Sequence, residues 1–255
     1  MDERVAVITG GSSGIGADLA RLLVADGWRC VLVARGEERL REMAEELGAE
    51  PEVCDVGDRA AVEALAERVA ARHPKIKLLV NNAGIPARAD FIAGDPARIE
   101  EVIRVNYLGG VWCLRAFLPA LEAAAPADVV NVVSVAGTVA IPPSGPYAAS
   151  KHAQLAFSRS TAAQLRGRRI RVHTVLPGFA ETAGFPQRTV LPKAFQWTII
   201  EPDRIARSIL AAVRRDRRES FVPWWYRPVA VLQAVTPSLM ARILARGKYG
   251  GPGAA

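Results

Sequence analysis

The chain has 255 residues, of which 50% are hydrophobic and 23% are charged, a balance that allows a sizeable core and excludes a disordered or fibrous protein. The formal net charge of +7 alone would suggest a nucleic-acid or membrane surface. However, residues 201–255 hold 10 basic and 4 acidic side chains, whereas the first 200 residues hold 23 and 22. Only the C-terminal part is therefore basic, and the body of the protein is nearly neutral.

The cysteine and histidine pattern predicts neither disulfides nor a metal site. Cys30, Cys54 and Cys113 form no CxxC pair, and we expect them to be buried as small hydrophobic residues. The three histidines lack the spacing of metal ligands. The N-terminus lacks the pattern of a signal peptide, and no apolar run is long enough for a membrane span. We therefore expect a cytoplasmic protein.

Short β-branched runs alternate with longer stretches of helical spacing along the chain. Because parallel strands need crossover connections, this alternation predicts an α/β protein with a doubly wound parallel sheet. Gly27, Gly48 and Gly167 follow three of the predicted helix ends. Without a linker or internal repeat, residues 1–255 are expected to form a single domain. The predicted strands are 4–9, 29–34, 52–54, 76–81, 129–134 and 171–176, with a possible edge strand at 220–223, and the predicted helices are 14–26, 37–47, 58–72, 96–123 and 146–166.

A glycine-rich turn, Thr9-Gly10-Gly11-Ser12-Ser13-Gly14-Ile15-Gly16, joins the first predicted strand to the first helix. Glycines allow backbone amides to approach a pyrophosphate, and the following helix N-terminus favours the anion. The spacing is G-x-x-x-G-x-G rather than the commoner G-x-G-x-x-G. The turn predicts a dinucleotide site, and the alternative is a tight turn that binds no ligand.

Further blocks follow in order, and with them the sequence resembles the single-domain short-chain dehydrogenase/reductase family. The resemblance implies a Rossmann-type sheet of order 3-2-1-4-5-6-7, a nicotinamide cofactor across the C-terminal strand ends, and a homodimer or homotetramer. The blocks after the glycine turn are Asp55-Val56, Asn81-Asn82-Ala83-Gly84, Asn106, Ser134, Tyr147-Ala148-Ala149-Ser150-Lys151 and Pro177-Gly178.

The predicted catalytic group centres on Tyr147 and Lys151, which lie four residues apart and share one face of a predicted helix. A phenol with a pKa of about 10 is a poor base, and a nearby cation favours the phenolate. The resemblance implies that Tyr147 is the general acid/base, Ser134 binds the substrate oxygen, Lys151 holds the nicotinamide ribose, and Asn106 belongs to a proton relay. Each residue has a plainer interpretation as a packed or solvated side chain.

The resemblance also implies the remaining cofactor contacts. Ala34 replaces the acidic residue that would bind a ribose 2′-hydroxyl, and Arg35 follows it. We therefore predict NADP(H) rather than NAD(H), with reduction as the cellular direction; the alternative is that Arg35 pairs with Glu37 or Glu38 at the surface. The implied contacts are Gly10, Ser12, Ser13, Gly14, Ile15 and Gly16 for the pyrophosphate, Asp55 and Val56 for the adenine, Asn82, Ala83 and Gly84 for the adenosine, and Pro177, Gly178 and Thr182 for the carboxamide.

Aromatic residues dominate the predicted substrate side. Residues 179–200 have the composition of a mobile apolar lid, and residues 221–255 form an apolar and basic extension. We expect a hydrophobic carbonyl or secondary alcohol of the steroid, retinoid or long-chain type. The alternatives are a catalytically silent NADP sensor and a protein that touches membranes through the arginine run 214–218 and nearby tryptophans. We expect no nucleic-acid partner, and the arginine run is otherwise an ordinary solvated segment.

Overall fold

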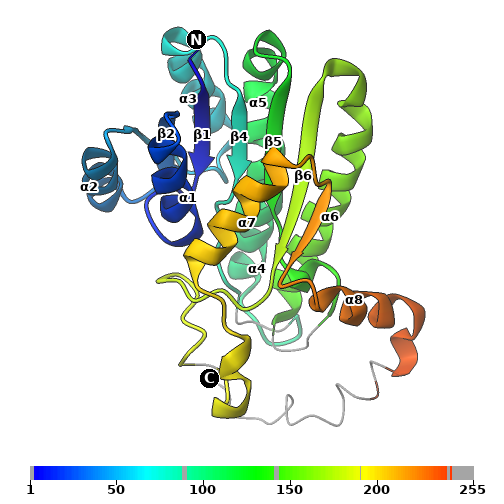
Figure 1. Cartoon of the computed structure of the whole chain (residues 1–255). Helices are drawn as coiled ribbons and strands as arrows, with labels where there is room; N and C mark the ends of the chain where they lie inside the picture. Colours follow the sequence, from blue (N-terminus) through cyan, green and yellow to red (C-terminus); the bar gives the residue numbers. More distant parts are fainter. Residues whose placement is uncertain (1–2, 88–90, 141–143, 190, 240–241, 243–255) are drawn as a thin grey trace.

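The centre of the computed structural model is a seven-stranded sheet with the order β3-β2-β1-β4-β5-β6-β7 (Figure 1). Every pairing between neighbouring strands is parallel. The structure describes residues 3–87, 91–140, 144–189, 191–239 and 242. The predicted fold class and strand order are confirmed. The strands are β1 (Val5–Thr9), β2 (Arg29–Ala34), β3 (Glu50–Val53), β4 (Leu78–Asn81), β5 (Ala127–Val132), β6 (Ile170–Pro177) and β7 (Glu219–Val222).

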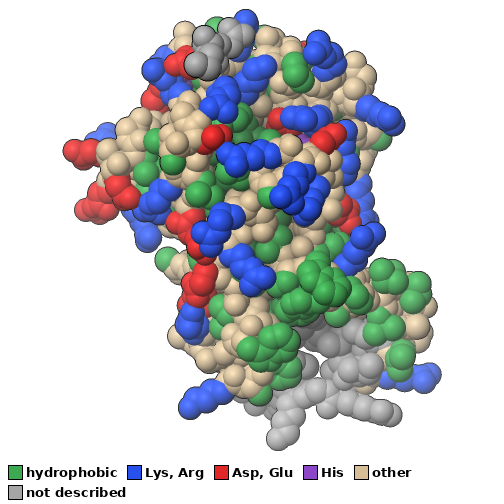
Figure 2. Space-filling view, in the orientation of Figure 1, with side chains coloured by type: hydrophobic (Ala, Val, Ile, Leu, Met, Phe, Trp, Pro, Cys, Tyr) green, Lys and Arg blue, Asp and Glu red, His purple; other side chains and the backbone are tan. Residues whose placement is uncertain are grey.

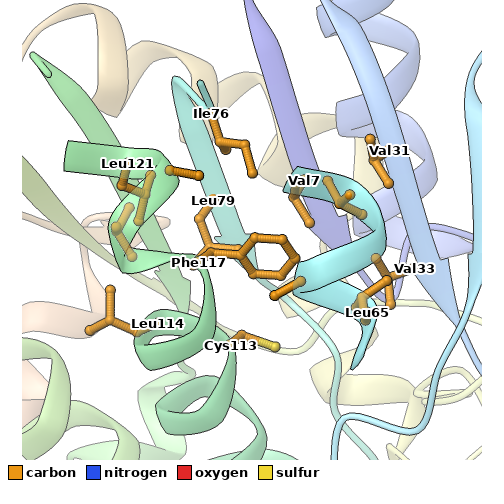
Figure 3. Packing of buried hydrophobic residues seen from close by; sticks show 14 of the residues in the cluster. Val7, Val31, Val33, Leu65, Ile76, Leu79, Cys113, Leu114, Phe117 and Leu121 are labelled. Carbon is orange, nitrogen blue, oxygen red and sulfur yellow. The ribbon is translucent and has the colours of Figure 1, made fainter. Parts of the chain in front are cut away.

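Helices cover both faces of the sheet, as the buried clusters show. One face packs against α3, α5 and the end of α6, and the other packs against α1, α2 and α7. Figure 3 shows Phe117 of α5 at the centre of the first cluster, between residues of the strands and of α3. The helices are α1 (Gly14–Ala25), α2 (Glu37–Leu47), α3 (Arg59–Arg72), α4 (Pro96–Ile103), α5 (Gly109–Ala123), α6 (Gly145–Gln164), α7 (Pro202–Arg214) and α8 (Tyr226–Val235).

The predicted helix 96–123 contains an interruption. A π-helical turn, Arg104–Leu108, separates α4 from α5 and contains Asn106. Such turns widen the helix by one residue and are frequent at functional sites. The interruption is invisible to a periodicity argument because the apolar spacing on either side remains helical.

Two of the three expected glycine helix ends are confirmed, and the third is wrong. Gly27 and Gly48 have φ values of 78° and 62°, the left-handed conformation that glycine adopts at least cost. Gly167 instead lies inside a 3₁₀ turn, Arg166–Arg168. The left-handed residue after α6 is Arg169, with φ of 58°. The expected edge strand is confirmed as β7.

The three cysteines are free and buried, as expected. Burial raises the pKa of the Cys30 and Cys113 thiols to about 12 and that of Cys54 to about 11. Thiols with such values stay protonated near neutral pH and are poor nucleophiles. The helices in the described part of the chain include none that is long and apolar enough to cross a membrane.

The segments that follow β6 and β7 form the region predicted to meet the substrate. Residues 179–200 contain a 3₁₀ turn, Lys193–Thr198, and isolated bridges within the segment join Ala180 to Ile200 and Thr182 to Phe185. Helix α8 lies at the same end of the molecule as this segment (Figure 1). The predicted extension 221–255 is described only to residue 239 and at residue 242.

Candidate active site

The glycine turn between β1 and α1 is packed so closely that side chains would not fit. A Cβ on Gly16 would lie 2.2 Å from the carbonyl oxygen of Gly10, and one on Gly10 would lie 2.8 Å from Asn82 Nδ2. Ser13 precedes α1 but provides no side-chain cap, and the first turn of this described helix carries no acidic residue. The free amides at this helix start therefore suit a phosphate group. The turn from Gly10 to Gly16, called the glycine cradle below, thus fits the pyrophosphate of a dinucleotide.

A hydrogen-bond network fixes the turn to the end of β4. Thr9 Oγ1 accepts from the backbone N–H groups of Asn82 and Ala83 at 3.0 and 3.1 Å and donates to Val80 at 3.1 Å. Asn82 Nδ2 donates to the carbonyl oxygens of Thr9 and Gly10 at 2.9 and 3.3 Å. Asn82 was predicted to line the adenosine, and in this structure its side chain holds the glycine turn. Thr9 begins the predicted turn, but its role in holding the turn is not predicted from the sequence, although a polar residue that ends a buried strand is a usable signal.

Helix α6 carries Tyr147 and Lys151, and Ser134 lies just beyond β5. The Lys151 ammonium nitrogen is 5.8 Å from the centroid of the Tyr147 ring. Ser134 is buried, and its hydroxyl accepts from the Ala136 N–H at 3.1 Å. Gly84 stands opposite, since a Cβ there would lie 3.7 Å from Lys151 Nζ and 3.4 Å from Asn106 Oδ1. The structure therefore brings together residues from α6, the ends of β4 and β5, and the π turn.

Asn106 is buried in the π turn, and its side chain is fully engaged. Its Oδ1 accepts from the Ile85 N–H at 2.8 Å, while Nδ2 donates to the Ile85 carbonyl at 3.0 Å and to Ser150 Oγ at 3.1 Å. Ser150 Oγ in turn donates to the carbonyl oxygen of Tyr147 at 2.7 Å. Ser150, which the sequence analysis did not single out, therefore connects the π turn to the start of α6. Its signal was the three-residue spacing from Tyr147, which places both on one helix face.

The environment of Tyr147 and Lys151 favours their neutral forms. Burial raises the pKa of Tyr147 to about 12, and a hydrogen bond with Ser134 opposes part of that rise. Burial also lowers the pKa of Lys151 to about 7. This direction for Tyr147 differs from the expectation that the cation would favour the phenolate. The reason is that burial dominates, and the ammonium donates to Val132 O and Gln154 Oε1 at 3.2 and 2.8 Å.

Arg35 follows β2, and its partners are not those considered from the sequence. Its guanidinium lies 3.9 Å from a carboxylate oxygen of Asp55 and 3.5 Å from one of Glu101, and its side chain is 50% exposed. Arg98, and then Arg35, hold the pKa of Glu101 below its usual value. Asp55 Oδ1 also accepts from the Gly57 N–H at 2.9 Å. The surface pairing with Glu37 or Glu38 is therefore replaced by pairing across the C-terminal edge of the sheet.

The remaining predicted contacts lie around the same edge. Val56 is buried and packs against Gly109, where a Cβ would lie 2.9 Å from Val56 Cγ2. Thr182 closes over the glycine turn, since a Cβ on Gly14 would lie 2.9 Å from Thr182 Cγ2. Ile15 packs against the cluster on the α1 face, and Ser12 is partly exposed in the turn. Pro177 ends β6, and its carbonyl accepts from Ser134 Oγ at 3.4 Å.

Aromatic side chains form the wall next to Gly178 and Tyr147. The Tyr226 ring packs directly on Gly178, where a Cβ would lie 2.2 Å from Tyr226 Cε2. The Phe185 ring lies 5.7 Å from that of Tyr147. Trp225 stacks on Tyr226 at 4.0 Å and lies 5.6 Å from Trp197. Residues 221–255 are grouped with the substrate side from the sequence, but the contact between Tyr226 and Gly178 is not predicted.

The family model described as short chain dehydrogenase matches residues 4–189. Dehydrogenase/reductase SDR family member 7B of Bos taurus is 31% identical over 261 residues, covering 94% of this chain and 80% of the bovine protein.

Two solved structures share both the fold and a moderate sequence identity with the chain. A short chain dehydrogenase from Burkholderia cenocepacia J2315 in complex with NADP has a TM-score of 0.82 at 28% identity, covering 95% of this chain and 97% of that one. A short chain dehydrogenase/reductase from Burkholderia phymatum in complex with NAD has a TM-score of 0.84 at 27% identity, covering 94% and 95%. Taken with the glycine cradle and the residues gathered at the sheet edge, these likenesses show that the chain belongs to the short-chain dehydrogenase/reductase family of oxidoreductases acting on CH–OH groups.

Proposed function

We propose that the protein is an NADP(H)-dependent reductase of hydrophobic carbonyl compounds, in which Tyr147 is the proton donor. The observation that carries this proposal is the grouping of the Tyr147 phenol, Ser134 and the Lys151 ammonium at the sheet edge, next to the glycine cradle. Carbonyl reduction needs a hydride and a proton, and these residues supply the proton side of the reaction. The nicotinamide would supply the hydride when bound.

The residues of the cradle would hold the nucleotide. Amides from Gly10 to Gly16 and the start of α1 would bind the pyrophosphate. Asp55 and Val56 would meet the adenine, Ala83 and Gly84 would border the adenosine, and Pro177, Gly178 and Thr182 would border the carboxamide, as the family resemblance implies. The packing of Thr182 on Gly14 supports this, because it places the start of the lid directly over the turn.

Tyr147 is suited to donating a proton. Because its pKa is raised to about 12, the phenol stays protonated at neutral pH and can protonate the oxygen of a carbonyl substrate. The Ser134 hydroxyl is hydrogen-bonded to the Tyr147 side chain and would stabilise the charge that develops on the substrate oxygen. Lys151 would bind the ribose, and Asn106 acts as a positioning residue, since its amide hydrogens are committed to Ile85 and Ser150.

Replacing Tyr147 by phenylalanine tests the catalytic assignment. Tyr147→Phe removes the transferable proton and keeps the ring, so we expect kcat to fall by about 10²- to 10⁴-fold while the NADPH dissociation constant stays unchanged. Tyr107→Phe is the matched control, because it removes a hydroxyl from a tyrosine whose ring packs against Phe157 instead. Activity of Tyr147→Phe within a few-fold of the parent protein would show that the assignment is wrong.

The proposed preference for NADP(H) rests on Arg35. Its carboxylate partners are partly exposed, and exposed ion pairs contribute little, so the guanidinium can turn towards a 2′-phosphate at low cost. Ala34 ends β2 without a carboxylate that would repel that phosphate.

A comparison of kcat/KM with NADPH and with NADH distinguishes a loss of this preference from a general loss of activity. We expect Arg35→Ala to lower kcat/KM with NADPH by about 10- to 150-fold, equivalent to about 1.5 to 3 kcal/mol, and to leave NADH almost unaffected. Arg39→Ala, at an exposed arginine of α2, should change neither. A parent enzyme that prefers NADH, or an equal loss with both cofactors, would contradict the proposal.

The proposed hydrophobic substrate rests on the aromatic wall. Phe185 beside Tyr147 and Phe179 beside Tyr226 offer apolar surface close to the reactive phenol. We expect KM to fall by up to about fourfold for each methylene added to a series of ketones or aldehydes, since each buried methylene contributes about 0.8 kcal/mol. The measurement is NADPH consumption across compounds of increasing chain length and ring number. A KM that is independent of size would contradict this substrate class.

A second proposal is peripheral contact with anionic membranes, favoured by one surface. Figure 2 shows hydrophobic side chains gathered over α8 and the neighbouring lid. Trp224 is 76% exposed, Trp197 73% and Val235 68%, and Arg227 of α8 borders Trp224 and Val235. Exposed tryptophans with flanking cations suit the interface of an anionic bilayer.

Cosedimentation with phosphatidylserine vesicles at low salt tests this surface. We expect binding that weakens on the double change Trp197→Ser and Trp224→Ser and that is absent with purely zwitterionic vesicles. No binding at low salt would contradict the proposal. Sedimentation velocity on the same variants would show whether the surface instead joins two copies of the chain.

A further inference from the structure

A glutamine side chain is buried next to the catalytic lysine. Gln154 lies on α6 three residues after Lys151 and is 1% exposed, and a three-residue spacing places two side chains on the same helix face. Its Oε1 accepts a hydrogen bond from Lys151 Nζ at 2.8 Å. Burying an amide costs free energy unless it is hydrogen-bonded, and this contact satisfies the oxygen of the buried Gln154 amide.

The contact also limits where the ammonium can point. A lysine ammonium has three N–H donors. Two of them are directed to Gln154 Oε1 and to the carbonyl oxygen of Val132 at 3.2 Å. Gly84 and the Tyr147 ring also lie beside the nitrogen, at the distances given above. The third donor is therefore left for the side on which Gly84 and Tyr147 lie.

We propose that Gln154 is a positioning residue that holds the Lys151 ammonium through its Oε1 and thereby leaves one N–H directed to the side of Gly84 and the Tyr147 ring. This inference rests on the proposed function, because it assumes that the charged form of Lys151 is the active one. A neutral acceptor stabilises that form without competing for the substrate or the phosphates. Gln154 thus opposes the burial that would otherwise neutralise the lysine.

The other groups that face the Lys151 ammonium do not include a second side-chain oxygen that accepts a hydrogen bond from it among the described contacts. Among the described residues, the titratable group beside the ammonium is Tyr147 of the same helix. Strand β5 presents the Val132 carbonyl, the segment after β4 presents Gly84, the π turn presents Asn106, and Ser134 is neutral. Burial lowers the pKa of Lys151 to about 7, so small changes in its hydrogen bonding alter its charge near neutral pH.

Nuclear magnetic resonance of lysine Cε carbons measures this charge directly. The chain has five lysines, so protein labelled with ¹³C at Cε gives few resonances, and Lys151→Arg assigns the one of interest. We expect Gln154→Met, which keeps the length but removes the acceptor, to lower the Lys151 pKa by about one pH unit. Gln154→Glu, which adds an opposite charge, should raise it by about one to three pH units. Gln164→Met, at an exposed glutamine of α6 bonded to Ser160, should leave it unchanged.

Turnover provides the second measurement. The alkaline limb of kcat/KM should move to lower pH in Gln154→Met and to higher pH in Gln154→Glu, whereas a merely structural role would lower activity without moving the limb in opposite directions. If Gln154→Met does not fold, Gln154→Asn removes the reach of the acceptor with a smaller change and should behave in the same way. An unchanged Lys151 pKa in both Gln154 variants, or shifts in one direction, would overturn the inference. The resonance titration does not depend on turnover, so an active Tyr147→Phe protein would contradict the proposed function and leave this result standing.

Discussion

The two sides of the site are built by different kinds of interaction. On the nucleotide side, the turn from Gly10 to Gly16 is held by hydrogen bonds from Thr9 and Asn82, and Asn106 holds the segment after β4. On the substrate side, aromatic rings stack from Trp197 through Trp225 to Tyr226. Hydrogen bonds are directional and fix geometry, whereas apolar contacts scale with area and tolerate rearrangement. The geometry of the nucleotide side therefore depends on individual residues, whereas that of the substrate side depends on the presence of enough apolar side chains.

The largest expected effect on cofactor binding comes from adding a methyl group on the nucleotide side, compared with the same addition on the substrate side. Gly16→Ala places a Cβ 2.2 Å from a backbone oxygen that cannot move freely. We expect it to weaken NADPH binding by more than about 100-fold and to lower the free energy of unfolding by about 1 to 3 kcal/mol. Gly184→Ala in the lid is the matched control, because no described atom beyond its two chain neighbours lies within 4 Å of its Cβ position, and it should change stability by less than about 0.5 kcal/mol. Isothermal titration and urea unfolding measure both, and similar losses in the two variants would contradict the contrast.

Amide side chains on the two sides should also differ in their contribution to stability. Asn106→Ala leaves the Ile85 N–H and carbonyl without their partner, so we expect the free energy of unfolding to fall by about 2 to 3 kcal/mol. Gln196→Ala removes bonds to the carbonyls of Arg188 and Leu191 in the lid and should cost less than about 1 kcal/mol. Urea denaturation of both variants checks this order. A larger loss from Gln196→Ala would show that the lid is as tightly specified as the nucleotide side.

The sequence predicts the sheet and the nucleotide side because local rules suffice there. Alternating apolar runs determine the strands, and a glycine turn between a strand and a helix needs no knowledge of distant residues. The C-terminal strand ends meet at one edge, so polar residues at those ends are expected to converge. The four-residue spacing predicts that Tyr147 and Lys151 share a helix face, the family resemblance adds Ser134, and the structure brings the three together.

The features that the sequence analysis missed depend on contacts between distant segments. The pairing of Arg35 with Asp55 and Glu101 depends on how the segment after β3 and helix α4 come to lie beside the end of β2. The packing of Tyr226 on Gly178 depends on the path of the chain after β7. Neither follows from periodicity or spacing. The buried Gln154 had a local signal, three residues after Lys151, but nothing in the sequence shows that an amide at that position is buried.

The charge of Lys151 offers a test of the nucleotide side that needs no ligand. Its pKa in the folded protein is lowered to about 7, while the unfolded chain has the ordinary lysine value. At pH values between these two pKa values, Lys151 is more protonated in the unfolded state than in the folded state. The free energy of unfolding therefore rises with pH by up to about 1.4 kcal/mol per pH unit. Lys151→Met lacks this contribution. We expect the stability of the parent protein, relative to the variant, to increase from pH 7.5 to 9.5, and parallel pH profiles would contradict a depressed lysine pKa.

The smallest expected effect on stability concerns the outer end of the aromatic stack. Trp197 is 73% exposed and lies 5.6 Å from Trp225, so Trp197→Ala should change the free energy of unfolding by less than about 0.5 kcal/mol. Its effect should fall on large substrates, because only they reach from Tyr147 past the lid to this ring. We expect KM to rise about two- to tenfold for a polycyclic ketone, since losing part of an apolar contact costs about 0.5 to 1.4 kcal/mol, and to stay constant for a short ketone. Trp28→Ala, at a tryptophan that packs under Arg4 beside β2, is the control and should leave the ratio of the two KM values unchanged. If Trp197→Ala raises both KM values equally, the lid acts on access or stability in general, and the aromatic stack is not a binding surface for the substrate.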